Sequence, residues 1–199
     1  MVLIEKLKKA AQKRQIVKII KARIKLKIIP IKDIRCQVST FAENQGFSGK
    51  TIDHFPPCKF FKMYLENTEK AKQAFMDWLT FCLIELETWR MDREQGGWRD
   101  GSLIEIIYAV HKEHGQPITR FENANPDLVR KGVQQKVNYY FGVLESIQKN
   151  GYAKTTVPPI LCYHVNGLYY LGGGHHRVSI LHTLGVKQAH VRINEKSRA

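Results

Sequence analysis

Residues 172–177 combine a flexible backbone with cationic side chains at one point of the chain, and we call them the GGGHHR box. They read Gly-Gly-Gly-His-His-Arg. Glycine lets the backbone turn sharply and approach a ligand closely, while histidine and arginine donate hydrogen bonds to anions. A glycine-rich turn alone is a weak signal. The chemistry indicated by the whole box is phosphate binding, by Gly173, Gly174, His175, His176 and Arg177.

The elements that must position the box can be predicted from its flanks. Residues 160–165 and 168–171 alternate as strands, and Asn166-Gly167 between them is typical of a tight hairpin turn. Residues 178–184 predict a helix that stops at Gly185. A helix start offers backbone N–H groups without intrahelical partners and a partial positive charge. A strand, a glycine turn and a cationic helix start together favour an anion site.

The order of motifs around the box resembles the ParB/sulfiredoxin superfamily. The likeness covers residues 125–193, about a third of the chain, and is carried by ESIQKNGY at 145–152, PPI at 158–160, the hairpin, the box, LGV at 184–186 and HVRI at 190–193. The resemblance implies a small α/β fold whose box holds nucleotide phosphates. Sulfiredoxins have a catalytic cysteine where this chain has His175, and ParB proteins have Gly-Glu-Arg-Arg. The His-His-Arg version is closer to the superfamily's small-molecule kinases, which carry an acid at the position of Gly173.

The resemblance to these kinases implies a nucleotide-dependent enzyme that transfers a phosphoryl group to a small molecule or a surface-polymer precursor. The expected cofactor is ATP or another nucleoside triphosphate, with or without Mg²⁺, and no protein metal site is expected. A base must accept the proton of the acceptor hydroxyl. Glu145, Asp100 and Glu122 are the candidates. Trp98 and Arg99 lie in a glycine-flanked loop and form a candidate substrate contact.

Two other functions remain open. One is a DNA-associated ParB-like protein that holds nucleic acid with a basic arm, although no helix-turn-helix pattern follows the box. The other is a non-catalytic nucleotide sensor, which the missing aspartate and the missing catalytic cysteine keep open. The sequence indicates neither the nucleotide identity nor the oligomeric state.

The positive charge of the chain is concentrated at its N-terminus. The net charge is +14, and residues 1–32 hold eleven Lys or Arg residues and a single acid, Glu5. Residues 1–23 predict a basic amphipathic helix. Three alternatives stay open for it: packing on the body, binding an anionic membrane surface through residues 1–22, or lying along nucleic acid, the last being the least favoured. The arm lacks aromatic residues, which disfavours stacking on single strands.

Cysteine use and hydropathy predict where the protein resides. Cys36, Cys58, Cys82 and Cys162 form no CxxC pair, which favours four reduced, mostly buried thiols in a cytoplasmic protein. No apolar run approaches the roughly 18 residues that span a bilayer. We therefore expect a cytoplasmic protein, with peripheral membrane contact if the arm binds lipid.

The predicted fold class is α/β (α+β), with a small mixed sheet, packed helices, and a domain over residues 24–199. A helical insert is expected at about residues 60–125. Residues 24–28 alternate as a strand, residues 40–66 look irregular, and long helices are expected from Asn67 toward Glu94, from Ser102, and from Asn125-Pro126 to Asn150. His111 and His114 share a helix face and suggest either a metal site or, as we expect, an exposed polar helix end.

Overall fold

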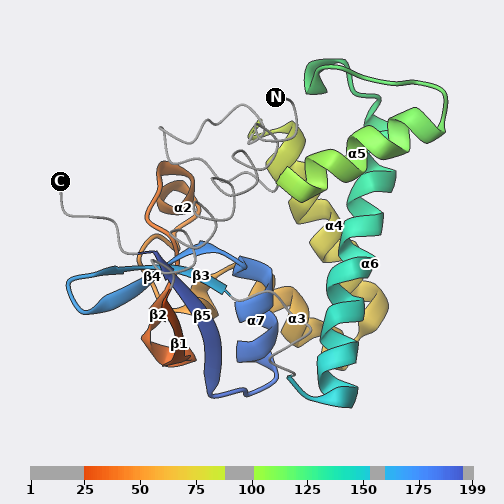
Figure 1. The fold of residues 1–199 in the computed structure, drawn as a ribbon. Helices are drawn as coiled ribbons and strands as arrows, with labels where there is room; N and C mark the ends of the chain where they lie inside the picture. The colour runs from red at the N-terminus through yellow and green to blue at the C-terminus, as the bar shows by residue number, and fades with distance from the viewer. Residues whose placement is uncertain (1–24, 88–100, 153–159, 195–199) are drawn as a thin grey trace, which may run out of the picture.

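The computed structural model describes residues 25–87, 101–152 and 160–194. Within these ranges the chain has an α+β fold in which a five-stranded sheet packs against helices (Figure 1). The predicted fold class is therefore confirmed. The basic arm of residues 1–23 and the loop residues Trp98, Arg99 and Asp100 lie outside the described residues.

The sheet is mixed and has the strand order β1-β5-β3-β4-β2. Strand β5 pairs antiparallel with β1 and parallel with β3, and β4 pairs antiparallel with β3 and parallel with β2. The strands are β1 (Lys25–Pro30), β2 (Ile34–Arg35), β3 (Ile160–Val165), β4 (Leu168–Gly173) and β5 (Gln188–Asn194). The C-terminal third thus supplies the three central strands, and an N-terminal strand closes each edge.

The β3–β4 hairpin forms where the sequence predicts it. Asn166 and Gly167 have φ values of 50° and 80°, and a two-residue turn with both central residues in this region suits the twist of a hairpin. Strand β4 continues to Gly173, two residues beyond the predicted end. The hairpin therefore runs directly into the box.

Six described α-helices accompany the sheet, five of them between β2 and β3. They are α2 (Thr40–Asn44), α3 (Pro57–Glu66), α4 (Thr68–Ile84), α5 (Gly101–Glu113), α6 (Pro126–Asn150) and, between β4 and β5, α7 (His175–Thr183); short 3-10 helices are η1 (Ile31–Asp33), η2 (Ile52–His54) and η4 (Phe121–Asn123). Two predicted N-caps, Asn67 and Asn125, are confirmed, whereas α5 begins at Gly101, one residue before the predicted start at Ser102. The Asn67 side chain accepts a hydrogen bond from the Lys70 N–H, and the Asn125 side chain accepts one from the Asp127 N–H.

Three sequence expectations about helix positions are wrong. Residues 40–66 contain α2, η2 and α3 rather than irregular chain. Helix α3 begins at Pro56-Pro57, because proline is well suited to the first helical turn, where its missing N–H has no intrahelical acceptor. Helix α4 ends at Ile84, well before Glu94, and α7 begins at His175, three residues before the predicted start.

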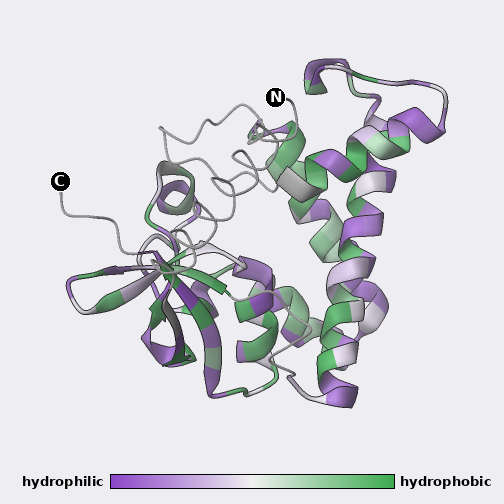
Figure 2. Cartoon of the chain, in the orientation of Figure 1, coloured by the Kyte–Doolittle hydropathy of each residue, from purple (hydrophilic) through white to green (hydrophobic). Residues whose placement is uncertain are grey.

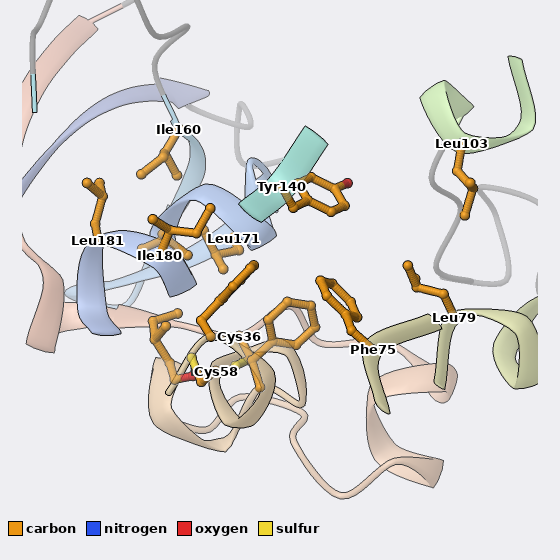
Figure 3. Packing of buried hydrophobic residues seen from close by; sticks show 14 of the residues in the cluster. Cys36, Cys58, Phe75, Leu79, Leu103, Tyr140, Ile160, Leu171, Ile180 and Leu181 are labelled. Atoms are coloured by element: carbon orange, nitrogen blue, oxygen red, sulfur yellow. Dashed lines mark hydrogen bonds between the residues drawn. The ribbon is translucent and has the colours of Figure 1, made fainter. Parts of the chain in front are cut away.

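The hydrophobic core joins the sheet to the helices through α7 and α3. These two helices lie between the sheet and the α4–α6 pair (Figure 1). Figure 3 shows Phe75 of α4 and Tyr140 of α6 between Ile180 of α7 on one side and Leu79 and Leu103 on the other. The α5 and α6 ribbons carry both hydrophobic and hydrophilic residues, as expected for helices with one buried face (Figure 2).

The four cysteines are free and buried, as the sequence predicts for reduced thiols. Burial raises the pKa of Cys36, Cys82 and Cys162 to about 12 and that of Cys58 to about 11. These thiols are therefore protonated and unreactive at neutral pH. In the described ranges, no helix is both long enough and apolar enough to cross a bilayer.

Candidate functional site

The box runs from the end of β4 through the N-cap of α7 into the first turn of that helix. Gly174 is the N-cap, with φ 80° and ψ 24°, and His175, His176 and Arg177 are the first three helical residues. The Val178 N–H donates to the Gly174 carbonyl at 3.0 Å, which is the first bond of the helix. The N–H groups of the three preceding helical residues have no acceptor within the helix. The sequence placed these residues in front of the helix, whereas the structure places them inside it.

The three glycines of the box have different surroundings. A Cβ on Gly172 would collide with the Tyr163 ring of β3. Gly174 adopts a left-handed conformation that is costly for other residues. Gly173 has neither constraint, because a Cβ there would make an ordinary contact with the Leu161 side chain at 3.5 Å. The local packing thus explains Gly172 and Gly174 and leaves room for a side chain at Gly173.

Arg177 folds back toward the start of its own helix. Its Nη2 atom lies 3.2 Å from the position that a Cβ on Gly174 would occupy. Burial lowers the pKa of the half-buried guanidinium, while Tyr139, Tyr152 and Tyr140 act in the opposite direction. Arginine remains protonated despite such a shift. The guanidinium charge is therefore added to the positive end of the α7 dipole.

The two histidines lie in different surroundings. His176 is 6% exposed and stacks on Tyr140 of α6, with ring centroids 4.1 Å apart. The rings of Phe55 and Phe75 lie 5.9 and 5.8 Å from it. His175 is partly exposed and lies 5.7 Å from Phe55. His176 thus lies within the aromatic core beneath the helix, while His175 lies nearer the surface.

The sequence reasoning missed Lys136 of α6. This lysine is 5% exposed, and its Nζ lies 4.8 Å from the ring centroid of Tyr140 and 5.4 Å from that of Tyr139. The spacing could have indicated it, since Lys136 falls between Val133 and Tyr140 on the apolar face of the helix. Because Tyr140 also stacks on His176, the Lys136 ammonium group and the box meet at the same tyrosine.

Glu145, a candidate base, lies on α6 and contacts another helix. Its carboxylate accepts a hydrogen bond from the Tyr64 hydroxyl of α3, and Tyr64 stacks on Phe141 at 4.2 Å. Burial, aided by the Glu145 carboxylate, raises the pKa of Tyr64 to about 12, so the phenol stays protonated and donates. The hydrogen bond of Glu145 therefore goes to α3 and not to the box. Glu122 is exposed in η4, and the catalytic role of any acid stays a prediction.

The expectation that His111 is an exposed helix end is wrong, because His111 is fully buried. Its Nδ1 lies 2.8 Å from the Ile107 carbonyl, and its Nε2 lies 3.0 Å from the Asn125 N–H. Nε2 must accept from that N–H, so the proton is on Nδ1 and the ring is neutral. His111 thus joins α5 to the start of α6. The described chain contains no group of three or more His, Cys, Asp or Glu side chains arranged to hold a metal ion.

A second group of titratable side chains lies at the opposite end of α7. His182 in its last turn has a lowered pKa, chiefly because of burial and then because of Lys62 of α3 and Lys187, while Asp53 of η2 acts against this shift. The pKa of Asp53 is itself lowered, first by a hydrogen bond with Thr51. This group is separated from the box by the length of the helix.

The residues of the box therefore bring together backbone N–H groups, the positive end of a helix and the Arg177 guanidinium, with Lys136 beside the Tyr140 ring on which His176 stacks. This combination is suited to binding phosphate groups. No family model matches the chain, and searches against curated proteins and solved structures likewise gave no match.

Proposed function

We propose that the GGGHHR box binds the phosphates of ATP or another nucleoside triphosphate, and that the protein transfers a phosphoryl group to a small molecule or a surface-polymer precursor. One observation carries the proposal: the Arg177 guanidinium lies against Gly174 at the N-terminus of α7. A cation at a helix N-terminus interacts unfavourably with the dipole, by about 0.3–1 kcal/mol. A polyphosphate bound at this point interacts favourably with both the guanidinium and the positive end of the helix dipole.

The box residues then have different roles. The N–H groups of His175, His176 and Arg177 bind phosphate oxygens, and the Arg177 fork makes charge-assisted hydrogen bonds. His175 adds a side-chain donor. His176, held between Tyr140 and the phenylalanine rings, positions the first turn.

Phosphoryl transfer depends mainly on positioning and charge neutralisation, which these groups provide. Mg²⁺ bound with the nucleotide needs only one or two protein carboxylates. The base is Glu145 or Asp100, and the Glu145 carboxylate accepts a hydrogen bond from the Tyr64 hydroxyl. Trp98 and Arg99 are the candidate substrate contacts.

The location that fits this function is the cytoplasm, where nucleotides are abundant and free thiols persist. Four buried free cysteines support it. The basic residues 1–22 would add contact with an anionic membrane surface.

The test measures nucleotide binding by thermal unfolding and by calorimetry. The ligands are ATP, ADP, CTP and GTP, each with and without Mg²⁺. A nucleotide at a hundred times its dissociation constant stabilises by about 2.7 kcal/mol. Arg177→Ala should lose this stabilisation and keep the fold, whereas Arg130→Ala, at an exposed position of α6, should keep both. Wild-type affinity in Arg177→Ala would overturn the site. Tight binding without ATP turnover over a panel of hydroxyl acceptors would favour the nucleotide sensor.

A further inference from the structure

Tyr139 is an exposed aromatic ring beside Lys136 and Tyr140. It is 59% exposed, while its helix neighbours Lys136 and Tyr140 are 5% and 7% exposed. A single exposed aromatic residue is ordinary in a soluble protein. Two further features distinguish this one.

The first feature is that the ring is held in place from one side. The Lys136 Nζ lies 5.4 Å from the Tyr139 ring centroid and 4.8 Å from that of Tyr140, so the ammonium group sits between two adjacent rings. Both rings therefore interact with the same cation through their π faces. This contact restricts Tyr139 while its high exposure leaves much of the ring accessible to a ligand.

The second feature is the position of the ring relative to the phosphate site. Tyr139 lies next to Tyr140, with ring centroids 5.7 Å apart, and Tyr140 in turn stacks on His176 in the first turn of α7. A single aromatic ring, that of Tyr140, therefore separates Tyr139 from the His176 side chain of the box. A ligand whose phosphates contact the first turn of α7 would have this ring within reach of its remaining groups.

We propose that Tyr139 is the surface on which the base of the bound nucleotide stacks, and that Lys136 positions this ring. This inference rests on the proposed function. It assigns to Tyr139 the preference of the site for a nucleotide over inorganic polyphosphate. Bases stack on aromatic side chains irrespective of their identity, because every base has a π face. The site should therefore discriminate strongly between nucleotides and polyphosphate and weakly among ATP, GTP and CTP.

The experiment compares ATP with inorganic tripolyphosphate by calorimetry at one salt concentration. Tyr139→Ala should weaken ATP about tenfold, which corresponds to about 1.4 kcal/mol, and leave tripolyphosphate unchanged. Tyr139→Phe keeps a ring and should bind both ligands as the wild type does. Phe81→Ala is the matched control, because it removes an exposed ring, 45% accessible, from α4.

The outcomes separate this inference from the function on which it rests. If wild-type protein binds neither ligand, the proposed function fails and the stacking role fails with it. If Arg177→Ala loses both ligands while Tyr139→Ala binds ATP normally, the phosphate site stands and the stacking role is overturned. Equal weakening of ATP and tripolyphosphate in Tyr139→Ala would also overturn it, since the ring would then act through the cations.

Discussion

His176 of α7 stacks on Tyr140 of α6, with ring centroids 4.1 Å apart and ring planes inclined by 23°. This contact joins the first turn of the helix that carries the box to the longest helix of the described chain. Arg177 is the next residue after His176, so its backbone is fixed by the same contact. Lys136 approaches the same tyrosine. The stacked pair thus sets where the cationic groups of the site lie.

The stacked pair should contribute to stability, and His176→Ala tests this. The substitution removes a buried ring that three aromatic neighbours surround. We expect a loss of about 2–4 kcal/mol in the free energy of unfolding, in the range for large-to-small core changes. Urea unfolding measures it. His164→Ala is the control, because His164 also stacks on a tyrosine, Tyr169 at 4.7 Å, yet is exposed. Equal effects of the two substitutions would contradict a core role for His176.

The glycines of the box should respond unequally to alanine. Gly174→Ala places a Cβ at φ 80° and should cost about 1–2 kcal/mol. Gly172→Ala displaces the Tyr163 ring and should cost about as much. Gly173→Ala should change stability by no more than about 0.5 kcal/mol, yet weaken ATP binding if phosphates approach that backbone. Unchanged ATP affinity in Gly173→Ala would show that the ligand contacts only the helix turn.

The sequence predicted the local elements of the site well, because local signals encode them. Asn166-Gly167 specifies the hairpin turn, and Asn125-Pro126 and Asn67 begin the helices that they cap. Helix α3 was missed because a proline pair was interpreted as a break instead of a first helical turn. The polar character of histidine also misled the interpretation of His111, which is buried. His111 is buried by a contact with the Asn125 N–H at the start of another helix, which spacing alone does not show, whereas Lys136 lies among tyrosine rings of its own helix.

Arginine geometry should matter at position 177. Arg177→Lys keeps one positive charge but loses the planar fork that binds phosphate oxygens in pairs. We expect Arg177→Lys to recover only part of the ATP affinity that Arg177→Ala loses, and calorimetry of the three proteins measures the order. Full recovery by lysine would mean that charge alone, without the fork, holds the ligand.

Stability should fall on mild acidification because of His182. Burial lowers the pKa of His182 in the folded protein below its ordinary value of 6.5. The unfolded chain therefore binds the proton more readily between these two pKa values, and stability rises with pH through that window. The melting temperature should be highest above about pH 6.5 and fall as pH decreases through the lowered pKa.

The substitution His182→Gln isolates this effect. The substitution should flatten the pH dependence of the melting temperature between about pH 5 and 7. The Asp53 carboxyl, whose pKa is lowered below 3.8, stays ionised throughout this range. His164→Gln, at an exposed position on β3, should leave the profile as in the wild type. A wild-type profile in His182→Gln would assign the pH dependence to other groups.

The basic arm should act independently of the box, and deletion of residues 1–22 tests this. The arm residues lie outside the described structure, but their charge does not depend on it: residues 1–32 carry +10 of the net charge of +14. Each basic residue near an anionic bilayer contributes about 1 kcal/mol, screened by salt. Full-length protein should sediment with anionic vesicles, and the truncated protein should not, while both keep the same ATP affinity.

The apolar face of the predicted arm helix should make vesicle binding less salt-sensitive than duplex DNA binding. If the truncated protein is insoluble, the apolar face of the arm helix belongs to the core. If the full-length protein prefers a defined DNA site to vesicles at equal salt, the DNA-associated alternative is favoured.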